Sequence, residues 1–118
     1  MHDLNLHYKL MKGVEDIDTQ FDMTELYEVI ENRLGISKED ILGKSRYRPI
    51  VDARMVLAYI LRTYNKETLQ SIGKIIDRDH SAVINLIKRF DDYTSTDKRF
   101  KKIYDNILWA LVNQQKGQ

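Results

Sequence analysis

The apolar residues of this chain recur at the spacing of an α-helix over most of its length, and this periodicity constrains the fold more than any other feature. Leu26, Ile30 and Leu34 form one stripe, and residues 100–111 carry a longer one. Intervals of three and four residues place side chains on one face of a helix, whereas a half-buried strand needs strict alternation, which no segment sustains. The sequence therefore predicts an all-α fold of about six helices.

Capping residues and glycines mark where the first two helices begin and end. Asp22 precedes a helical pattern, and Glu25 three residues later completes a sequence typical of a capping box. Ser37 begins a short second helix for the same reason. Gly35 and Gly43 follow these helices, and glycine is the residue that most readily ends a helix.

The middle of the chain predicts two longer helices and a shorter one between them. Pro49 suits the first turn of a helix, where its missing N–H is not needed, and that helix runs from about 50 to 64. Asn65 is expected to end it in the left-handed conformation. A second helix follows from about 66 to 76, and a third from 79 or 80 to about 93.

The last helix closes the predicted fold. Ser95 or Thr96 is expected to cap it, and its apolar stripe, together with Trp109, is expected to lie in the core. A face for self-association is the alternative for this stripe.

The charge of the chain is divided along its length. The net charge is only +1, but residues 1–43 carry ten acids and four bases, whereas residues 44–118 carry fifteen bases and eight acids. Such a polarity suggests a polyanionic partner for one face.

With 118 residues, the chain is long enough for one domain. We expect the domain in residues 22–118 and an N-terminal extension in residues 1–21, for which a short helix or an extended arm both stay open.

Several classes of function lack the residues they require. The chain has no Cys, and its three His do not cluster with carboxylates. A Gly-rich phosphate loop, a G-x-S-x-G motif and a Cys nucleophile are all missing. We therefore expect no metal, no cofactor and no enzymatic activity. No apolar run approaches the roughly 18 residues that cross a bilayer, and the N-terminus has no signal-peptide core, which favours a cytoplasmic protein.

A tight turn at residues 77–78 joins the last two helices of the middle segment, which is the helix-turn-helix arrangement. The stretch 72–83 reads IGKIIDRDHSAV. It resembles the signature of the C-terminal DNA-binding domain of the bacterial replication initiator DnaA, in which an Ile-Gly precedes a turn, a basic residue and Asp-His-Ser/Thr-Thr-Val. The resemblance extends over about residues 22–112 and includes the basic loop 44–48.

The sequence departs from the family's pattern in three respects. The second Thr of the motif is Ala82, which keeps only a methyl group. Asp77 occupies the position where the initiator usually has two Gly. The helix that follows the turn, which we call the recognition helix, is therefore expected to have a slightly different position. The family's ATP-binding module has no counterpart in this sequence, and we expect a passive DNA binder rather than a complete initiator.

The resemblance implies that the helix opening with Asp79 enters the major groove of duplex DNA. A carboxylate can accept a hydrogen bond from the N4 amino group of cytosine, and the other residues can contact base edges or a thymine methyl group. The resemblance also places Arg46 in the minor groove, where a narrow groove concentrates negative potential. The residues expected to contact bases are Arg46, Asp79, His80, Ser81, Ala82 and Asn85.

The resemblance further implies contacts with phosphates. Arg54 and Arg62 are eight residues apart, about two turns, and so share a helix face. The helix beginning near Leu69 offers free N–H groups to a phosphate. The residues expected to contact phosphates are Lys44, Arg48, Arg54, Arg62, Leu69, Gln70 and Arg78. A run of bases is more often a solvated face, and this is the interpretation favoured for Lys88, Arg89, Lys98, Arg99, Lys101 and Lys102.

Each of these residues also has a purely structural interpretation. Asp79 can simply cap its helix, a role compatible with base contact, and His80 can be an ordinary surface residue. The basic loop 44–48 can be solvated, and Arg62 can pair with an acid in residues 22–40.

The favoured function is sequence-specific binding of double-stranded DNA resembling a DnaA box. Its setting would be transcription, the marking of an origin, or competition with the initiator. The competing hypothesis is a protein-interaction module that keeps the fold without binding DNA, with the acidic residues 1–43 as its partner surface. The oligomeric state stays open.

Overall fold

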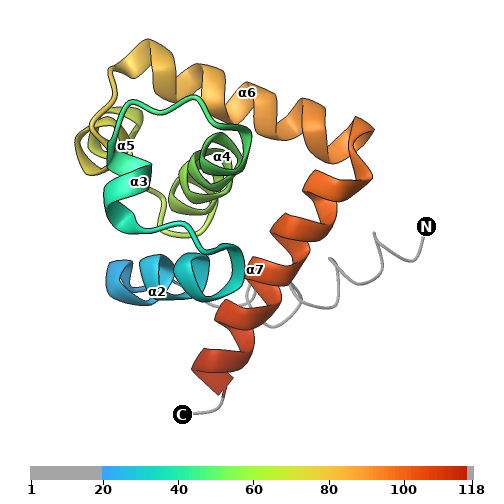
Figure 1. Cartoon of the computed structure of the whole chain (residues 1–118). Coiled ribbons are helices and arrows are strands. Elements are labelled where there is room, and N and C mark those ends of the chain that lie inside the picture. Colours follow the sequence, from blue (N-terminus) through green and yellow to red (C-terminus); the bar gives the residue numbers. More distant parts are fainter. Residues whose placement is uncertain (1–19, 117–118) are drawn as a thin grey trace.

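A computed structural model of the chain describes residues 20–116, and over this range it contains six helices and no strand (Figure 1). The predicted all-α class is therefore confirmed. In chain order the helices are α2 (Met23–Leu34), α3 (Lys38–Leu42), α4 (Arg48–Thr63), α5 (Leu69–Ile76), α6 (His80–Thr96) and α7 (Lys98–Lys116). None of them is both long enough and apolar enough to span a membrane. The choice between a helix and an arm for the N-terminal extension falls on residues 1–19, outside the described residues.

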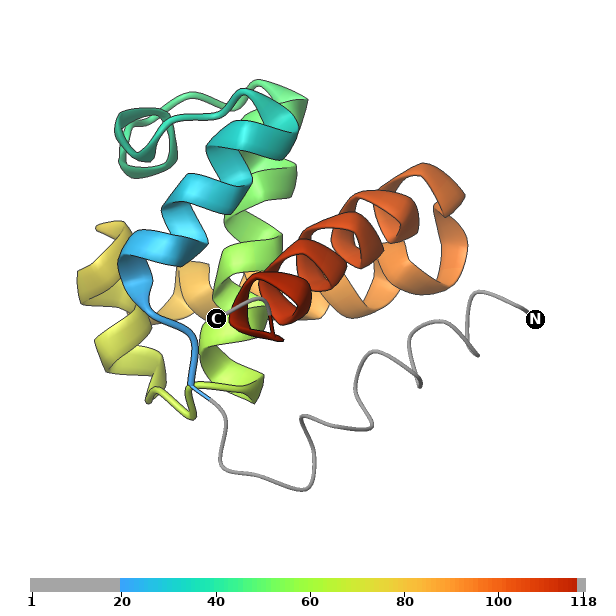
Figure 2. The ribbon, with the colours of Figure 1, turned by 90° about the horizontal axis from the view of Figure 1, so that it is seen from below.

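Helix α4 lies at the centre, and the other helices pack around it. Figure 2 shows α2 running beside α4, with α7 crossing close to α2. Small and branched side chains let α4 be surrounded on most sides: Ile50, Ala53, Met55, Val56, Leu57, Ala58, Ile60 and Leu61 are all buried. Buried side chains on most of its faces, which include the charged Asp52 and Arg54, place α4 in the interior of the domain.

An aromatic cluster fixes the corner where α6 turns into α7. The rings of Tyr59 on α4 and Phe90 on α6 are stacked, with centroids 3.8 Å apart. Tyr104 of α7 meets both rings edge-on, at 5.6 and 4.8 Å, and Phe100 meets Phe90 at 5.5 Å. Offset and edge-to-face pairs add directional attraction to the burial of apolar area. The cluster therefore sets the angle at which α7 returns across the molecule.

The turn between α5 and α6 depends on a close backbone approach at Gly73. A Cβ atom on this residue would lie 2.5 Å from the carbonyl oxygen of Arg78, so only glycine fits. Asp77 ends α5 in the left-handed conformation, with φ 57° and ψ 54°. Aspartate tolerates this region better than most residues, which explains how one residue closes the turn that the resemblance associates with two glycines.

Most of the predicted caps are confirmed. The Asp22 side chain accepts a hydrogen bond from the Glu25 N–H, and Ser37 and Asp40 form a full capping box. Gly35 ends α2 with φ 72°. These signals act within one helical turn, and so they can be read from neighbouring residues alone.

The boundaries predicted around α4 and α5 are partly wrong. Helix α4 begins at Arg48, two residues before the expected position, and α5 begins at Leu69, capped by Thr68 rather than opening near residue 66. Lys66, not Asn65, adopts the left-handed conformation, with φ 56°. The Asn65 amide instead binds both backbone groups of the buried Phe21, at 2.8 and 2.9 Å. This partner lies 44 residues away, which no local pattern reveals.

Two expectations for the last helix are also corrected. Ser95 and Thr96 lie inside α6, and their hydroxyls donate to the carbonyls of the preceding turn. The side chain of Asp97 instead caps α7 by accepting a hydrogen bond from the Phe100 N–H at 3.1 Å. Trp109 is 46% exposed rather than in the core. The stripe itself is confirmed as core at Phe100, Tyr104, Ile107, Leu108 and Leu111.

Candidate nucleic-acid interface

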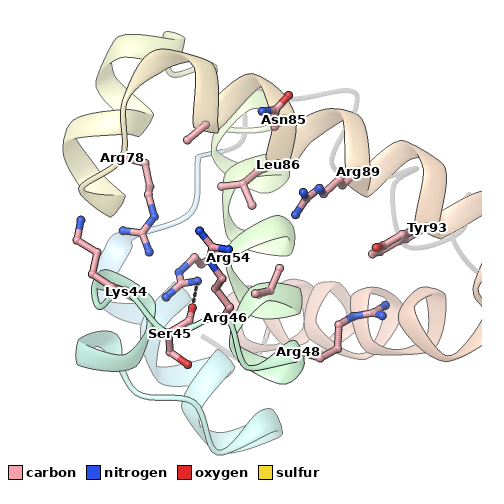
Figure 3. A pocket seen from close by; sticks show the side chains of 12 residues that line it. Lys44, Ser45, Arg46, Arg48, Arg54, Arg78, Asn85, Leu86, Arg89 and Tyr93 are labelled. Carbon is pink, nitrogen blue, oxygen red and sulfur yellow. Dashed lines mark hydrogen bonds between the residues drawn. The ribbon is translucent and has the colours of Figure 1, made fainter.

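A groove of about 680 Å³ lies between the connection from α3 to α4 and the exposed face of α6 (Figure 3). Its lining includes six cationic side chains and no carboxylate: Lys44, Arg46, Arg48, Arg54, Arg78 and Arg89. A concave surface with charges of one sign concentrates the electrostatic potential and attracts ligands of the opposite sign. The groove is therefore suited to a polyanion.

In the structure the basic loop spans residues 43–47, because Arg48 is already the first residue of α4, and this loop forms one wall of the groove. Lys44, Ser45 and Arg46 are exposed, and all three line the cavity. The Ser45 hydroxyl accepts a hydrogen bond from the Tyr47 N–H at 3.1 Å. Among the described residues, no hydrogen bond or ion pair holds the guanidinium of Arg46. Its side chain can therefore reach a ligand without giving up a contact within the protein.

Arg54 lies beneath the basic loop and is only 5% exposed. Its guanidinium donates four hydrogen bonds to backbone carbonyls, those of Asp40, Ile41, Gly43 and Ser45, at 2.7 to 3.2 Å. A guanidinium has five N–H groups, so these bonds occupy most of them. Burial, followed by the nearby charge of Arg78, lowers the pKa of Arg54 from its ordinary value.

Arg78 connects the turn before α6 to the same loop. Its guanidinium donates to the carbonyl of Gly43, and also to those of Asp77 at 2.9 Å and Ile76 at 3.2 Å. The side chain therefore points from the helix-turn-helix unit toward the basic loop, as Figure 3 shows.

Arg48 is held at the far end of the groove by two acids and an aromatic ring. It donates to Asp52 at 2.6 Å and to Asp97 at 3.1 Å, and its guanidinium carbon lies 4.6 Å from the centroid of Tyr93. The hydrogen bond with Asp52 raises the pKa of Arg48. The Phe100 N–H, followed by Arg48, lowers the pKa of Asp97. These contacts fix Arg48 at the groove while leaving its side chain 45% exposed.

Asp52 is the buried centre of this ion-pair network, and a second arginine, Arg99 of α7, donates to it at 2.9 Å. We expect Asp52→Ala to lower the free energy of unfolding by about 2 kcal/mol, because two charge-assisted hydrogen bonds are lost. Denaturant unfolding measures this change. The exposed Asp92→Ala on α6 is the matched control, and it should stay within about 0.5 kcal/mol of the wild type. Equal stability of the two variants would contradict the role of the network.

The first turn of α6 presents polar side chains to solvent. Asp79 caps the helix by accepting from the Ala82 N–H at 2.8 Å, which confirms the structural interpretation of this residue. His80, Ser81 and Asn85 are exposed, whereas Ala82 is half-buried. Ala82 and Asn85 line the main groove. His80 lines a neighbouring hollow of about 460 Å³, together with Gln70, Lys74, Asp77 and Arg78.

The remaining predicted phosphate contacts lie away from the main groove, at the start of α5. Leu69 is half-buried and Gln70 is exposed in the first turn, where Thr68 accepts from the Ser71 N–H. Arg62 is exposed and donates to the carbonyl of Glu67 at 3.1 Å. Over residues 20–113, Arg62 forms no ion pair with an acid of α2 or α3. It is therefore placed beside the N-terminus of α5, where free N–H groups add to its charge.

Arg89 is a groove residue that sequence reasoning placed on a solvated face. It lines the cavity from α6, as does Tyr93. The spacing in the sequence could have revealed this position, because Ala82, Asn85, Arg89 and Tyr93 follow one another at intervals of three or four residues and so lie on one face of the helix.

Within the part of the chain that the structure describes, no group of three acidic or His side chains is arranged to hold a metal.

Comparison with known proteins gives consistent matches. The family described as "Bacterial dnaA protein helix-turn-helix" matches residues 23–89, from the start of α2 into α6. The chain is 32% identical over 97 residues to the chromosomal replication initiator protein DnaA of Flavobacterium psychrophilum, which covers 81% of this chain and 20% of that protein. The chain is 34% identical over 94 residues to the same protein of Mycoplasma capricolum, and this match covers 79% of this chain and 21% of that protein. The chain thus spans about a fifth of the length of these relatives. No solved structure gives a significant match.

Proposed function

The chain belongs to the bacterial DnaA helix-turn-helix family, and on this premise we propose that it binds double-stranded DNA sequence-specifically, at a site resembling a DnaA box. The observation that carries the proposal is the groove between the basic loop and α6, whose lining has six cationic side chains and no acid. A surface that neutralises several phosphates at once obtains most of its affinity from the release of counterions.

In this proposal the first turn of α6 reads bases in the major groove. Asp79, His80, Ser81, Ala82 and Asn85 are the reading residues, because all but Ala82 are exposed and all lie within two turns of the helix start. Capping leaves one carboxylate oxygen of Asp79 to accept from a base, since its Oδ1 is the atom that binds the Ala82 N–H. Ala82 offers only a methyl group, which suits contact with thymine.

The basic loop reads the minor groove in the same proposal. Arg46 enters it, because its guanidinium has no partner among the described residues, and arginine is weakly hydrated compared with lysine. Lys44, Arg48 and Arg78, which line the groove of the protein, would contact the phosphates that border the minor groove of the DNA. Arg54 lines the same cavity, and its charge contributes to the potential there although its N–H groups bind the loop.

A second set of phosphate contacts lies at the start of α5, formed by Arg62 and by the backbone of Leu69 and Gln70. We expect Arg62→Ala to weaken binding to box and scrambled duplexes equally, and to reduce the slope of log K against log salt by about 1. Fluorescence anisotropy across a salt series measures both. A loss confined to the box duplex would assign Arg62 to base recognition instead.

The proposed binding needs no nucleotide, and it would place the protein with the nucleoid, at an origin, at a promoter, or in competition for the initiator's boxes. The test is competitive binding of a labelled DnaA-box duplex against unlabelled box and scrambled duplexes at physiological salt. The box competitor should be effective at a concentration at least about 100-fold lower. Equal competition would overturn sequence-specific binding. It would favour a protein-interaction module acting through the acidic residues 1–43.

A further inference from the structure

Two arginine side chains from different elements meet at one backbone oxygen. The carbonyl of Gly43 accepts a hydrogen bond from Nη2 of Arg54 at 2.8 Å and another from Nη2 of Arg78. Gly43 is the first residue of the basic loop, and Arg54 lies in the middle of α4. Arg78 directly precedes Asp79, the residue that caps α6. The oxygen therefore lies at the junction of the two parts of the chain that are proposed to read DNA.

Arg54 fixes the path of the loop backbone as well as this junction. Its other hydrogen bonds go to the carbonyls of Ile41 at 2.8 Å, Ser45 at 2.7 Å and Asp40 at 3.2 Å. Two of its four acceptors, Gly43 and Ser45, lie in the loop directly before Arg46, and the other two lie in α3. A planar guanidinium presents its donors in a rigid fork, so a single side chain holds several carbonyls in fixed relative positions.

The arrangement has an electrostatic cost that points to a positioning role. Two guanidinium groups converge on the same oxygen, and the charge of Arg78 adds to burial in disfavouring the charged form of Arg54. A residue needed only for its charge would extend toward solvent, as Lys44 does: its side chain is 80% exposed, and its ion pair with Asp77, at 4.0 Å, is also at the surface. Arg54 instead directs its donors inward, to carbonyls of the loop.

We infer that Arg54 and Arg78 are positioning residues that join the basic loop to the recognition helix as one rigid unit. Arg46 and the first turn of α6 are thereby held at a fixed separation. The minor-groove contact and the major-groove contacts then fall on base pairs that are a fixed distance apart along the DNA. This inference rests on the proposed function and adds a determinant of specificity to it. It distinguishes Arg54 from a simple phosphate contact, for which charge alone would suffice.

Charge-conserving variants separate the two roles. Lysine keeps the positive charge at position 54 or 78, but its single ammonium group replaces the planar five-donor fork and cannot hold the same set of carbonyls. We expect Arg54→Lys and Arg78→Lys each to lower the ratio of box to scrambled affinity by about tenfold or more. Arg33→Lys, an exposed substitution on α2 outside the groove, is the matched control and should leave the ratio unchanged.

Two further measurements test the coupling itself. In an Arg46→Ala background, Arg54→Lys should change the ratio by less than about twofold, because the residue it positions is already gone. A box duplex with one base pair inserted between the minor-groove and major-groove contacts should be rejected by the wild type. The Arg78→Lys variant should bind this duplex and the intact box with more similar affinities.

The outcomes are distinguishable from failure of the proposed function. If the wild type binds box and scrambled duplexes equally, the proposed function fails. If the wild type prefers the box and both lysine variants keep that preference within about twofold, only the positioning role is overturned. Circular dichroism and thermal unfolding establish that each variant is folded. Should Arg54→Lys fail to fold, Arg78→Lys, which leaves the buried Arg54 in place, decides the question alone.

Discussion

We expect the Gly73→Ala variant to lose about 2 to 4 kcal/mol of unfolding free energy, and to lose DNA binding in proportion to its unfolded fraction. The added Cβ would lie 2.5 Å from the carbonyl oxygen of Arg78. Both partners are backbone or directly attached to it, so no flexible side chain can move aside. The turn must open, and this separates α5 from α6 and exposes Ile76 and Val83, both of which are fully buried.

The sign of this change in stability distinguishes Gly73→Ala from an ordinary glycine substitution in a helix. Alanine normally stabilises a helix interior relative to glycine by about 1 kcal/mol, so the expected loss has the opposite sign. Denaturant unfolding followed by circular dichroism measures it. Asp77→Gly, in the same turn, is the control: it removes a side chain from a left-handed residue and should leave stability unchanged or slightly raised. A Gly73→Ala midpoint at or above that of the wild type would show that the close approach is absent.

The second large effect is expected at Arg46. Arg46→Ala should weaken binding to the box duplex by about 1 to 3 kcal/mol and relax the base preference at the positions that the loop reads. The reason is geometric as well as electrostatic: the guanidinium is free of partners among the described residues, and it projects from a loop whose backbone Arg54 holds. Because Arg46 is exposed, the stability of the folded domain should not change.

Anisotropy titrations of box and scrambled duplexes test this expectation. His80→Ala should show a loss of similar size through the major groove, and Arg33→Ala on α2 should show none. Equal weakening of box and scrambled duplexes by Arg46→Ala would mean that Arg46 contacts only phosphates. In that case specificity would rest on α6 alone.

Features governed by neighbouring residues could be predicted from the sequence. The caps at Asp22 and Ser37 and the stop at Gly35 each depend on groups within one turn, and the structure confirms all three. The features that sequence reasoning missed depend on distant partners. Asn65 was expected to turn the chain, yet its amide binds Phe21, 44 residues earlier. Trp109 was expected in the core, but it is 46% exposed, and the guanidinium carbon of Arg33 on α2 lies 5.9 Å from the centroid of its ring.

In the candidate site, too, the features set by neighbouring residues could be predicted from the sequence, and those set by distant contacts could not. The basic loop and the opening of α6 could be recognised because their residue types are unusual and consecutive. Arg54 and Arg62 could not be told apart, since both are arginines on one helix at a spacing of two turns. The structure buries Arg54 against four carbonyls and exposes Arg62. Backbone carbonyls are present at every residue, so a side chain that binds them leaves no complementary residue for a pattern to find.

Selection of bound duplexes from a random pool determines whether this chain reads a DNA sequence. The wild-type chain should enrich one site related to a DnaA box, with preferences in two blocks, one for the loop and one for α6. The same selection with Arg46→Ala should lose the block that the loop reads and keep the other. Recovery of a pool no different from its starting composition would show that the chain does not bind DNA sequence-specifically.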